Sequence, residues 1–138
     1  MGSHVSFEIP ADLEQIERVS SGIEQCMKGQ DWGDEAILDV QLAVEEAVTN
    51  SILHGYDGSV GTIAIRIDTS PHHITVEIED GAPAFDPLSV PEPDIAADLE
   101  DRQIGGLGIF LIRRMMDEVT YRYEDNKNVL VLEKKRTT

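Results

Sequence analysis

The chain has 138 residues, and 41% of them are hydrophobic, so length and composition predict one globular domain with a core of its own. Its 27 Asp and Glu residues outnumber its 11 Lys and Arg residues, which gives a net charge of −16. This excess of acid argues against nucleic acid or an anionic membrane as a partner, because both require clustered cations, but it permits binding to a basic protein surface. No apolar run is long enough for a membrane span, and the single cysteine, Cys26, is consistent with a reducing compartment, so we expect a cytoplasmic protein.

The first half of the chain predicts one strand followed by two helices. We interpret residues 1–4 as the remnant of an expression tag and expect residues 5–138 to form the single domain. Residues 5–9 alternate as a short edge strand, and residues 12–29 have the spacing of an amphipathic helix. A second helix is expected from an N-cap at Asp34 to a stop at Gly55.

Two further strands, at residues 62–67 and 74–79, are predicted from strict alternation and form a half-buried antiparallel pair. Asp80 continues the phase of the apolar residues Ile74, Val76 and Ile78. Its side chain should therefore point toward the core. A buried carboxylate requires hydrogen-bond donors, which either the protein or a ligand supplies.

The last third begins with a long segment, residues 82–104, that has no clear period and contains four prolines. A loop of this length in a small domain is functional or disordered, although residues 95–99 could form a helical turn. The glycine stretch at residues 105–108 should lead into a short helix at residues 109–116, with Leu107, Leu111 and Met115 facing inward. Strands at 119–123 and 129–133, joined by a turn at 125–128, precede a basic tail at 134–136. The order predicts an α+β fold, a two-layer sandwich with a mostly antiparallel mixed sheet and helices on one face.

Two groups of residues could carry chemistry. Glu46 and Asn50 are one helical turn apart, so they share a face on which the carboxylate could act as a general base and the carboxamide as a metal ligand. The alternative is an ordinary solvated polar face. Gly105, Gly106 and Gly108 lead into a helix, where backbone amides can bind an anion, although glycines also form simple hinges.

Three motifs in order resemble one family over nearly the whole chain. They are Glu46-Ala47-Val48-Thr49-Asn50 with His54-Gly55-Tyr56, then Glu79-Asp80 with Phe85-Asp86-Pro87, then Gly105-Gly106-Leu107-Gly108-Ile109 with Met116-Asp117-Glu118-Val119. The sequence resembles the GHKL (Bergerat-fold) ATPases, and within them the anti-sigma-factor serine kinases of the RsbW and SpoIIAB type.

The resemblance implies ATP and Mg²⁺ as cofactors and a role for each motif. Glu46 matches the general base that takes the proton from a protein serine, Asn50 the residue that holds Mg²⁺, and Asp80 the aspartate that accepts from the adenine amino group. Residues 88–104 correspond to the family's ATP lid. Gly105, Gly106, Leu107 and Gly108 match the end of that lid, where backbone amides bind the phosphates. His54 could reach the phosphates or pack at the helix end, and Arg102 could contact phosphate or remain solvated.

The chain departs from the family pattern at two places near the adenine site. Ala82 stands where relatives commonly have a glycine, two residues after the aspartate, and Gly81 comes one residue early. Asn128 and Val129 stand where many relatives have threonines, so a hydrogen bond to the adenine site could be lost or replaced.

By resemblance, we expect an ATP-dependent protein serine kinase that is also an anti-sigma factor. It would sequester a sigma factor, phosphorylate a serine of a STAS-type anti-anti-sigma factor, and form a homodimer. The alternative is a nucleotide-binding partner-switch module that regulates a non-sigma target with little or no kinase activity. Two rivals are weaker: a histidine-kinase ATP domain lacks its phospho-acceptor helices here, and a pure ATPase lacks a transducing domain.

Overall fold

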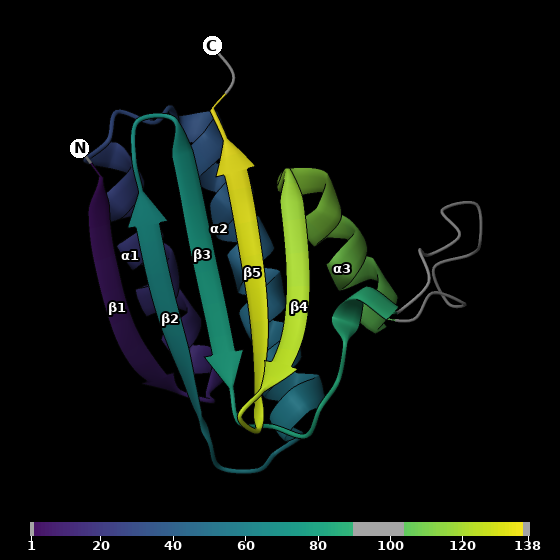
Figure 1. Ribbon diagram of the computed structural model, residues 1–138. Helices are drawn as coiled ribbons and strands as arrows, with labels where there is room; N and C mark the ends of the chain where they lie inside the picture. The colour runs from purple at the N-terminus through teal and green to yellow at the C-terminus, as the bar shows by residue number, and fades with distance from the viewer. Residues whose placement is uncertain (1, 90–103, 137–138) are drawn as a thin grey trace.

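The computed structural model describes residues 2–89 and 104–136, and its elements follow the predicted order (Figure 1). The elements in chain order are β1 (Ser3–Pro10), η1 (Leu13–Gln15), α1 (Ile16–Lys28), α2 (Asp34–Asn50), η2 (Ser51–Tyr56), β2 (Thr62–Thr69), β3 (His73–Asp80), η3 (Pro87–Ser89), α3 (Ile104–Met115), β4 (Glu118–Glu124) and β5 (Lys127–Lys135). None of the helices in this described part is long and apolar enough to cross a membrane.

The fold is a two-layer α+β sandwich, as predicted. Five strands form one sheet in the order β1-β2-β3-β5-β4, and the three α-helices cover one face of it (Figure 1). Every neighbouring pair is antiparallel, so the expectation of a mixed sheet was wrong. The last strand, β5, lies between β3 and β4, and α2 packs against both α1 and α3.

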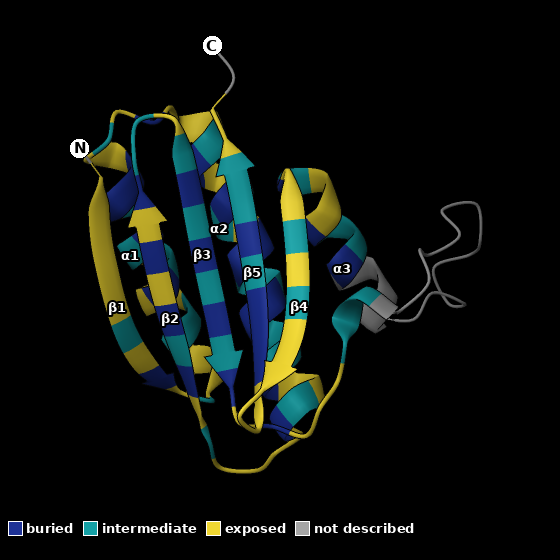
Figure 2. Cartoon of the chain, viewed as in Figure 1, coloured by how far each residue is buried: buried dark blue, intermediate teal, exposed yellow. Residues whose placement is uncertain are grey.

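On β2 and β3, the residues that alternate between apolar and polar in the sequence also alternate between more and less buried in the structure (Figure 2). On β2 and β3 the isoleucines and Val76 point toward the helices and are at most 2% exposed. β-branched side chains suit a pleated strand with one buried face. The same period places Asp80, at the end of β3, on the buried face, which confirms that prediction.

The sheet begins earlier than expected. Ser3 and His4, which the sequence reading set aside as tag residues, pair with Thr69 and Asp68 as the first rungs of the β1–β2 ladder. The backbone of an edge strand continues as long as its neighbour offers hydrogen-bond partners, whatever the side chains are.

The main helix starts and stops at different residues from those predicted. Its N-cap is Gly33, and Asp34 lies in the first turn, where a negative charge interacts favourably with the helix dipole. At the other end α2 continues into the π-helical segment η2, which runs through Gly55. The chain leaves this segment at Asp57, which adopts the left-handed conformation with φ 48°. A β-carbon on Gly55 would lie 3.2 Å from that of Ala82, so close packing explains this glycine better than helix termination.

The inward stripe predicted for α3 was wrong in part. Ile109, Ile112 and, just after the helix, Met116 are buried, whereas Leu111 is only partly buried. Met115 packs partly buried against the core, and the side chain of Leu107 lies outside the described part of the structure. Almost every residue from 109 to 116 except the two arginines is apolar, so two adjacent stripes fit the helical period equally well.

The C-terminal residues belong to the sheet. Lys134 and Lys135 lie in β5 rather than in a basic tail. The ammonium of Lys134 donates to the carbonyl of Met115 at 2.8 Å, where a cation stabilises the C-terminus of α3. The β4–β5 turn is made by Asp125 and Asn126, both with positive φ, which leaves Asn128 in the strand.

Candidate functional site

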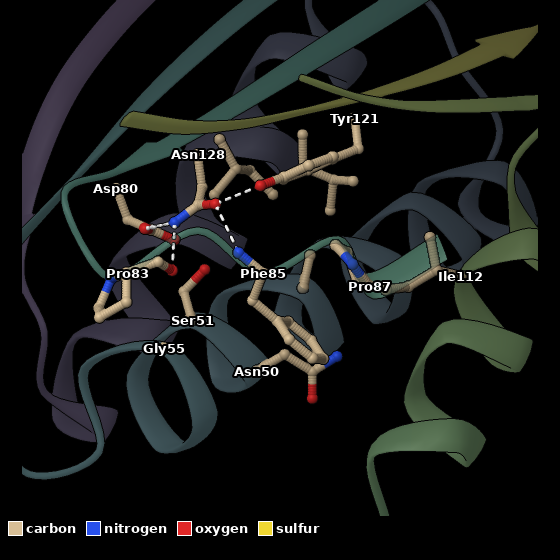
Figure 3. Close-up of a pocket in the computed structure, with 13 residues that line it drawn as sticks. Asn50, Ser51, Gly55, Asp80, Pro83, Phe85, Pro87, Ile112, Tyr121 and Asn128 are labelled. Carbon is tan, nitrogen blue, oxygen red and sulfur yellow. Dashed lines mark hydrogen bonds between the residues drawn. The ribbon is translucent and has the colours of Figure 1, made fainter. Parts of the chain in front are cut away.

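One pocket opens between the ends of β3 and β5, the segment that follows β3, and the helices α2 and α3 (Figure 3). Its walls are mostly apolar, with a few polar groups. The lining residues are Ala47, Asn50, Ser51, Gly55, Ile78, Asp80, Pro83, Phe85, Pro87, Ile112, Tyr121, Asn128 and Leu130. An apolar cleft with a few fixed polar groups is the usual form of a small-molecule site.

Asp80 is the charged group at the closed end of this pocket. Its side chain is 6% exposed. Oδ1 accepts a hydrogen bond from the amide of Ala82 at 3.0 Å and another from the side-chain amide of Asn128 at 2.9 Å. Within residues 2–89 and 104–136, no group donates to Oδ2. The described residues therefore satisfy one carboxylate oxygen of Asp80 and provide no donor for the other.

Asn128 connects the groups around Asp80. Its amide nitrogen also donates to the carbonyls of Ala82 and Pro83, at 3.0 Å and 3.1 Å. Its oxygen accepts from the amide of Phe85 at 3.1 Å and from the hydroxyl of Tyr121. Asn128, at one of the two places where the sequence departs from the family pattern, therefore supplies a hydrogen bond to Asp80.

Sequence reasoning missed these roles of Asn128 and Tyr121. Asn128 was expected in a turn, and no role in the site was expected for Tyr121. Asn128 stands directly opposite Asp80 in the β3–β5 register, and Tyr121 lies on β4. The sequence did contain a signal for Asn128. It precedes Leu130 and Leu132 in steps of two along the strand, so its side chain should point inward as theirs do.

Tyr121 is held as a hydrogen-bond donor by its surroundings. Burial raises the pKa of its phenol, and the nearby negative charges of Asp86 and Asp80 raise this pKa further. A phenol that keeps its proton can donate to the carbonyl oxygen of Asn128 but cannot act there as an anion.

Tyr56 connects the start of β2 to the residue that follows Asp80. Its hydroxyl donates to the carbonyl of Thr62 at 2.6 Å and accepts from the amide of Gly81 at 2.7 Å. A β-carbon on Gly61 would lie 2.2 Å from the ring of Tyr56, so glycine is required at that position. Gly81 has no such restriction, and the shifted glycine after Asp80 is accommodated without strain.

Helix α2 contributes some of its predicted residues to the pocket and not others. Asn50, at the end of α2, and Ser51, at the start of η2, line it (Figure 3). Glu46 is half-buried one turn before Asn50 but does not line the pocket. His54 is exposed and does not line it either.

The glycine stretch lies differently from the prediction. Helix α3 begins at Ile104, so Gly105, Gly106, Leu107 and Gly108 are within its first turns rather than before it. The unpaired amides of these turns still point toward the N-terminal end of the helix. Arg102 and the possible helical turn at 95–99 lie outside the described residues, as does most of the predicted lid.

Contacts of the segment after Phe85 connect the pocket to α3. The carboxylate of Asp86 accepts from the amide of Leu88 at 2.8 Å. The guanidinium of Arg113, on α3, donates to the carbonyl of Leu88 at 3.0 Å. This segment is thus fixed to the helix that carries the glycines.

The pocket between the helices and the sheet, apolar with a buried aspartate, has the form of a small-molecule site. Residues 9–134 match the family described as the histidine kinase-like ATPase domain. The chain belongs to this family, and within it to the group that contains the anti-sigma-factor serine kinases.

Individual relatives support this assignment. The serine-protein kinase RsbW of Listeria monocytogenes serovar 1/2a is 29% identical over 136 residues, which span 95% of this chain and 87% of the relative. The anti-sigma F factor of Thermoanaerobacter sp. (strain X514) is 36% identical over 98 residues, 70% of this chain and 68% of the relative.

A solved structure shows the same fold. The crystal structure of the RsbU and RsbW domains of a Mycobacterium tuberculosis protein superposes with a TM-score of 0.67 at 13% identity. The match covers 96% of this chain but 31% of that longer one.

Proposed function

We propose that this chain is an ATP-dependent protein serine kinase that also acts as an anti-sigma factor. Its family and the names of its relatives, serine-protein kinase RsbW and anti-sigma F factor, support this function. The observation that carries it is the pocket, which has a buried aspartate with one uncommitted oxygen and is lined by the helix that bears Glu46 and Asn50.

In this proposal the pocket holds the adenine of ATP. Asp80 accepts from the exocyclic amino group through Oδ2, which has no donor among the described residues. Asn50 holds Mg²⁺ through its carboxamide oxygen, an oxygen ligand of the kind this hard cation accepts. The described residues contain no cluster of three or more His, Cys, Asp and Glu suited to a metal. Phosphate oxygens and water would supply the other ligands of the ion. When bound, the ion neutralises phosphate charge.

The phosphates are assigned to the N-terminal end of α3. The amides of Gly105, Gly106, Leu107 and Gly108 lie in the first turns of that helix, where the dipole favours an anion. We also propose that the side chains of His54 and Arg102 contact the phosphates.

Glu46 is proposed as the general base. It takes the proton of the substrate serine while the serine oxygen forms a bond to the γ-phosphorus. The bond between that phosphorus and the β–γ bridging oxygen breaks, which leaves phosphoserine and ADP. Phosphoryl transfer depends mainly on positioning and charge neutralisation, so one base, a metal and backbone amides are sufficient.

The proposed partners are proteins. One is a sigma factor, which the chain sequesters, and the other is a STAS-type anti-anti-sigma factor, whose serine it phosphorylates. A net charge of −16 suits a basic contact surface on a partner. We also propose that the protein forms a homodimer and works in the cytoplasm, where a sigma factor meets RNA polymerase.

Transfer of labelled phosphate from ATP to a purified STAS partner tests the function. Glu46→Gln should keep ATP affinity and lose transfer by about a hundredfold or more, the usual contribution of a positioned base. Glu45→Gln is the matched control, because Glu45 is the adjacent acid but accepts from Ser20 on α1. It should transfer phosphate at the parental rate.

Two outcomes would contradict this reading. Equal transfer by Glu46→Gln and the parent would remove Glu46 from the role of base. A parent that binds ATP and its partners but never transfers phosphate would favour the nucleotide-responsive partner-switch module instead.

A further inference from the structure

The hydrogen-bond donors that the protein places at the closed end of the pocket are already used within the protein. The Asn128 amide serves Asp80, Ala82 and Pro83. The backbone amide of Ala82 serves Asp80, and that of Gly81 serves Tyr56. A ligand at this end therefore cannot rely on these groups for a hydrogen bond.

Two polar atoms at this end remain uncommitted in the described part of the chain. One is Oδ2 of Asp80, an acceptor. The other is the hydroxyl of Ser51, which lines the same pocket and points toward the cluster of Asp80 and Asn128 (Figure 3). Asn50, the polar residue at the end of α2 that also lines the pocket, points away from this cluster (Figure 3).

The Ser51 hydroxyl is not used in a hydrogen bond within its own helix. A serine within a helix often donates to the carbonyl four residues earlier. Here the backbone amide of Ser51 bonds to the carbonyls of Ala47 and Val48, and its hydroxyl has no partner among residues 2–89 and 104–136. A donor in a pocket wall with no internal partner is available to a ligand.

We infer that Ser51 is a specificity-determining residue that donates a hydrogen bond to the ring nitrogen N1 of the bound adenine, directly or through one water. This inference rests on the proposed function. A 6-aminopurine presents a donor, its amino group, next to an acceptor, N1. The pair of Oδ2 of Asp80 and the hydroxyl of Ser51 is the complement of that edge. A 6-oxopurine would instead direct a carbonyl oxygen toward the carboxylate.

The test compares ATP with 1-deaza-ATP, in which a C–H group replaces N1, by calorimetric titration of the full chain. The parent should bind ATP more tightly than the analogue. Ser51→Ala should bind ATP about three- to tenfold more weakly, as expected for the loss of one hydrogen bond, and should bind 1-deaza-ATP as the parent does. Ser51→Thr, which keeps a hydroxyl, should restore the preference for ATP.

The matched control is Ser21→Ala, an exposed serine-to-alanine change on α1 far in sequence from the pocket, which should leave both affinities unchanged. If Ser51→Ala weakens both nucleotides equally, or weakens neither, the inference is wrong although ATP binding stands. If the folded parent binds neither nucleotide, the proposed function fails together with the inference.

Discussion

At the scale of single residues, the closed end of the pocket depends on one asparagine. Asn128 is 8% exposed and uses both its nitrogen and its oxygen to hold Asp80 and the segment after β3. A threonine is too short to make all these contacts. Asn128 therefore holds the aspartate and the segment after β3 at the same time.

Truncation of this residue should cost stability. Asn128→Ala leaves the carbonyls of Ala82 and Pro83 and the amide of Phe85 without their partner, so we expect a loss of about 1–3 kcal/mol in the free energy of unfolding. Urea titration followed by circular dichroism measures it. Asn50→Ala is the matched control, because Asn50 has no internal hydrogen bond among the described residues, and it should be as stable as the parent. Equal stability of both variants would contradict the role of Asn128.

The sequence predicted the burial of Asp80 but not its partner. Burial followed from a period of two within one strand, which is local information. The pairing of Asp80 with Asn128 joins residues 48 positions apart and depends on which strand lies beside β3. Asparagine near a hairpin is also a common turn residue, so composition favoured the wrong assignment.

At the scale of elements, ion pairs connect the strands on the sheet face that the helices leave open. Glu77 on β3 bonds to Arg66 on β2 at 2.7 Å and to Arg122 on β4 at 2.9 Å. Between these groups lies Val129 of β5, which is only 4% exposed although it is on the open face. The charged side chains thus cover an apolar residue as well as pairing with each other.

This network predicts a pH-dependent contribution to stability. Burial favours the neutral form of Glu77, but the hydrogen bonds from Arg66 and Arg122 outweigh it and lower the pKa of the carboxyl. A group whose pKa is lower in the folded state stabilises the fold above its unfolded pKa and loses this contribution as the pH falls through the folded value. Glu77→Gln should therefore cost about 1 kcal/mol at neutral pH, and the difference from the parent should vanish in acid.

Urea titrations across the acid range measure this difference. Glu118→Gln, on the exposed start of β4, is the control, because Glu118 forms no ion pair within the described residues. A cost for Glu77→Gln that stays constant with pH would show that the side chain acts by packing alone.

Element identities were predictable, but element ends and helix faces were less so. The alternation on β2 and β3 identified both strands because one face is buried and the other is not. In α3, an almost wholly apolar segment left two possible stripes, and contact with α2 selected the one with Ile109 and Ile112. Such a choice is made by tertiary packing, so it cannot be read from the helix alone.

At the scale of the whole molecule, the net charge of −16 dominates the long-range field. We expect association with a basic partner to be steered by this field and to slow as salt screens it. Raising NaCl from about 0.05 M to about 0.5 M should lower the association rate constant about tenfold while the dissociation rate changes less. Stopped-flow fluorescence with the sigma factor measures both constants, and an association rate that is independent of salt would contradict steering.

The position of β5 has a consequence for synthesis on the ribosome. The chain emerges with β1, β2 and β3 first, yet the strand that completes the sheet beside β3 is the last to be made. Until residue 128 has left the exit tunnel, Asp80 lacks one of its two internal donors, and the edge of β3 is unpaired. A nascent chain therefore cannot complete this pocket until β5 has emerged from the ribosome.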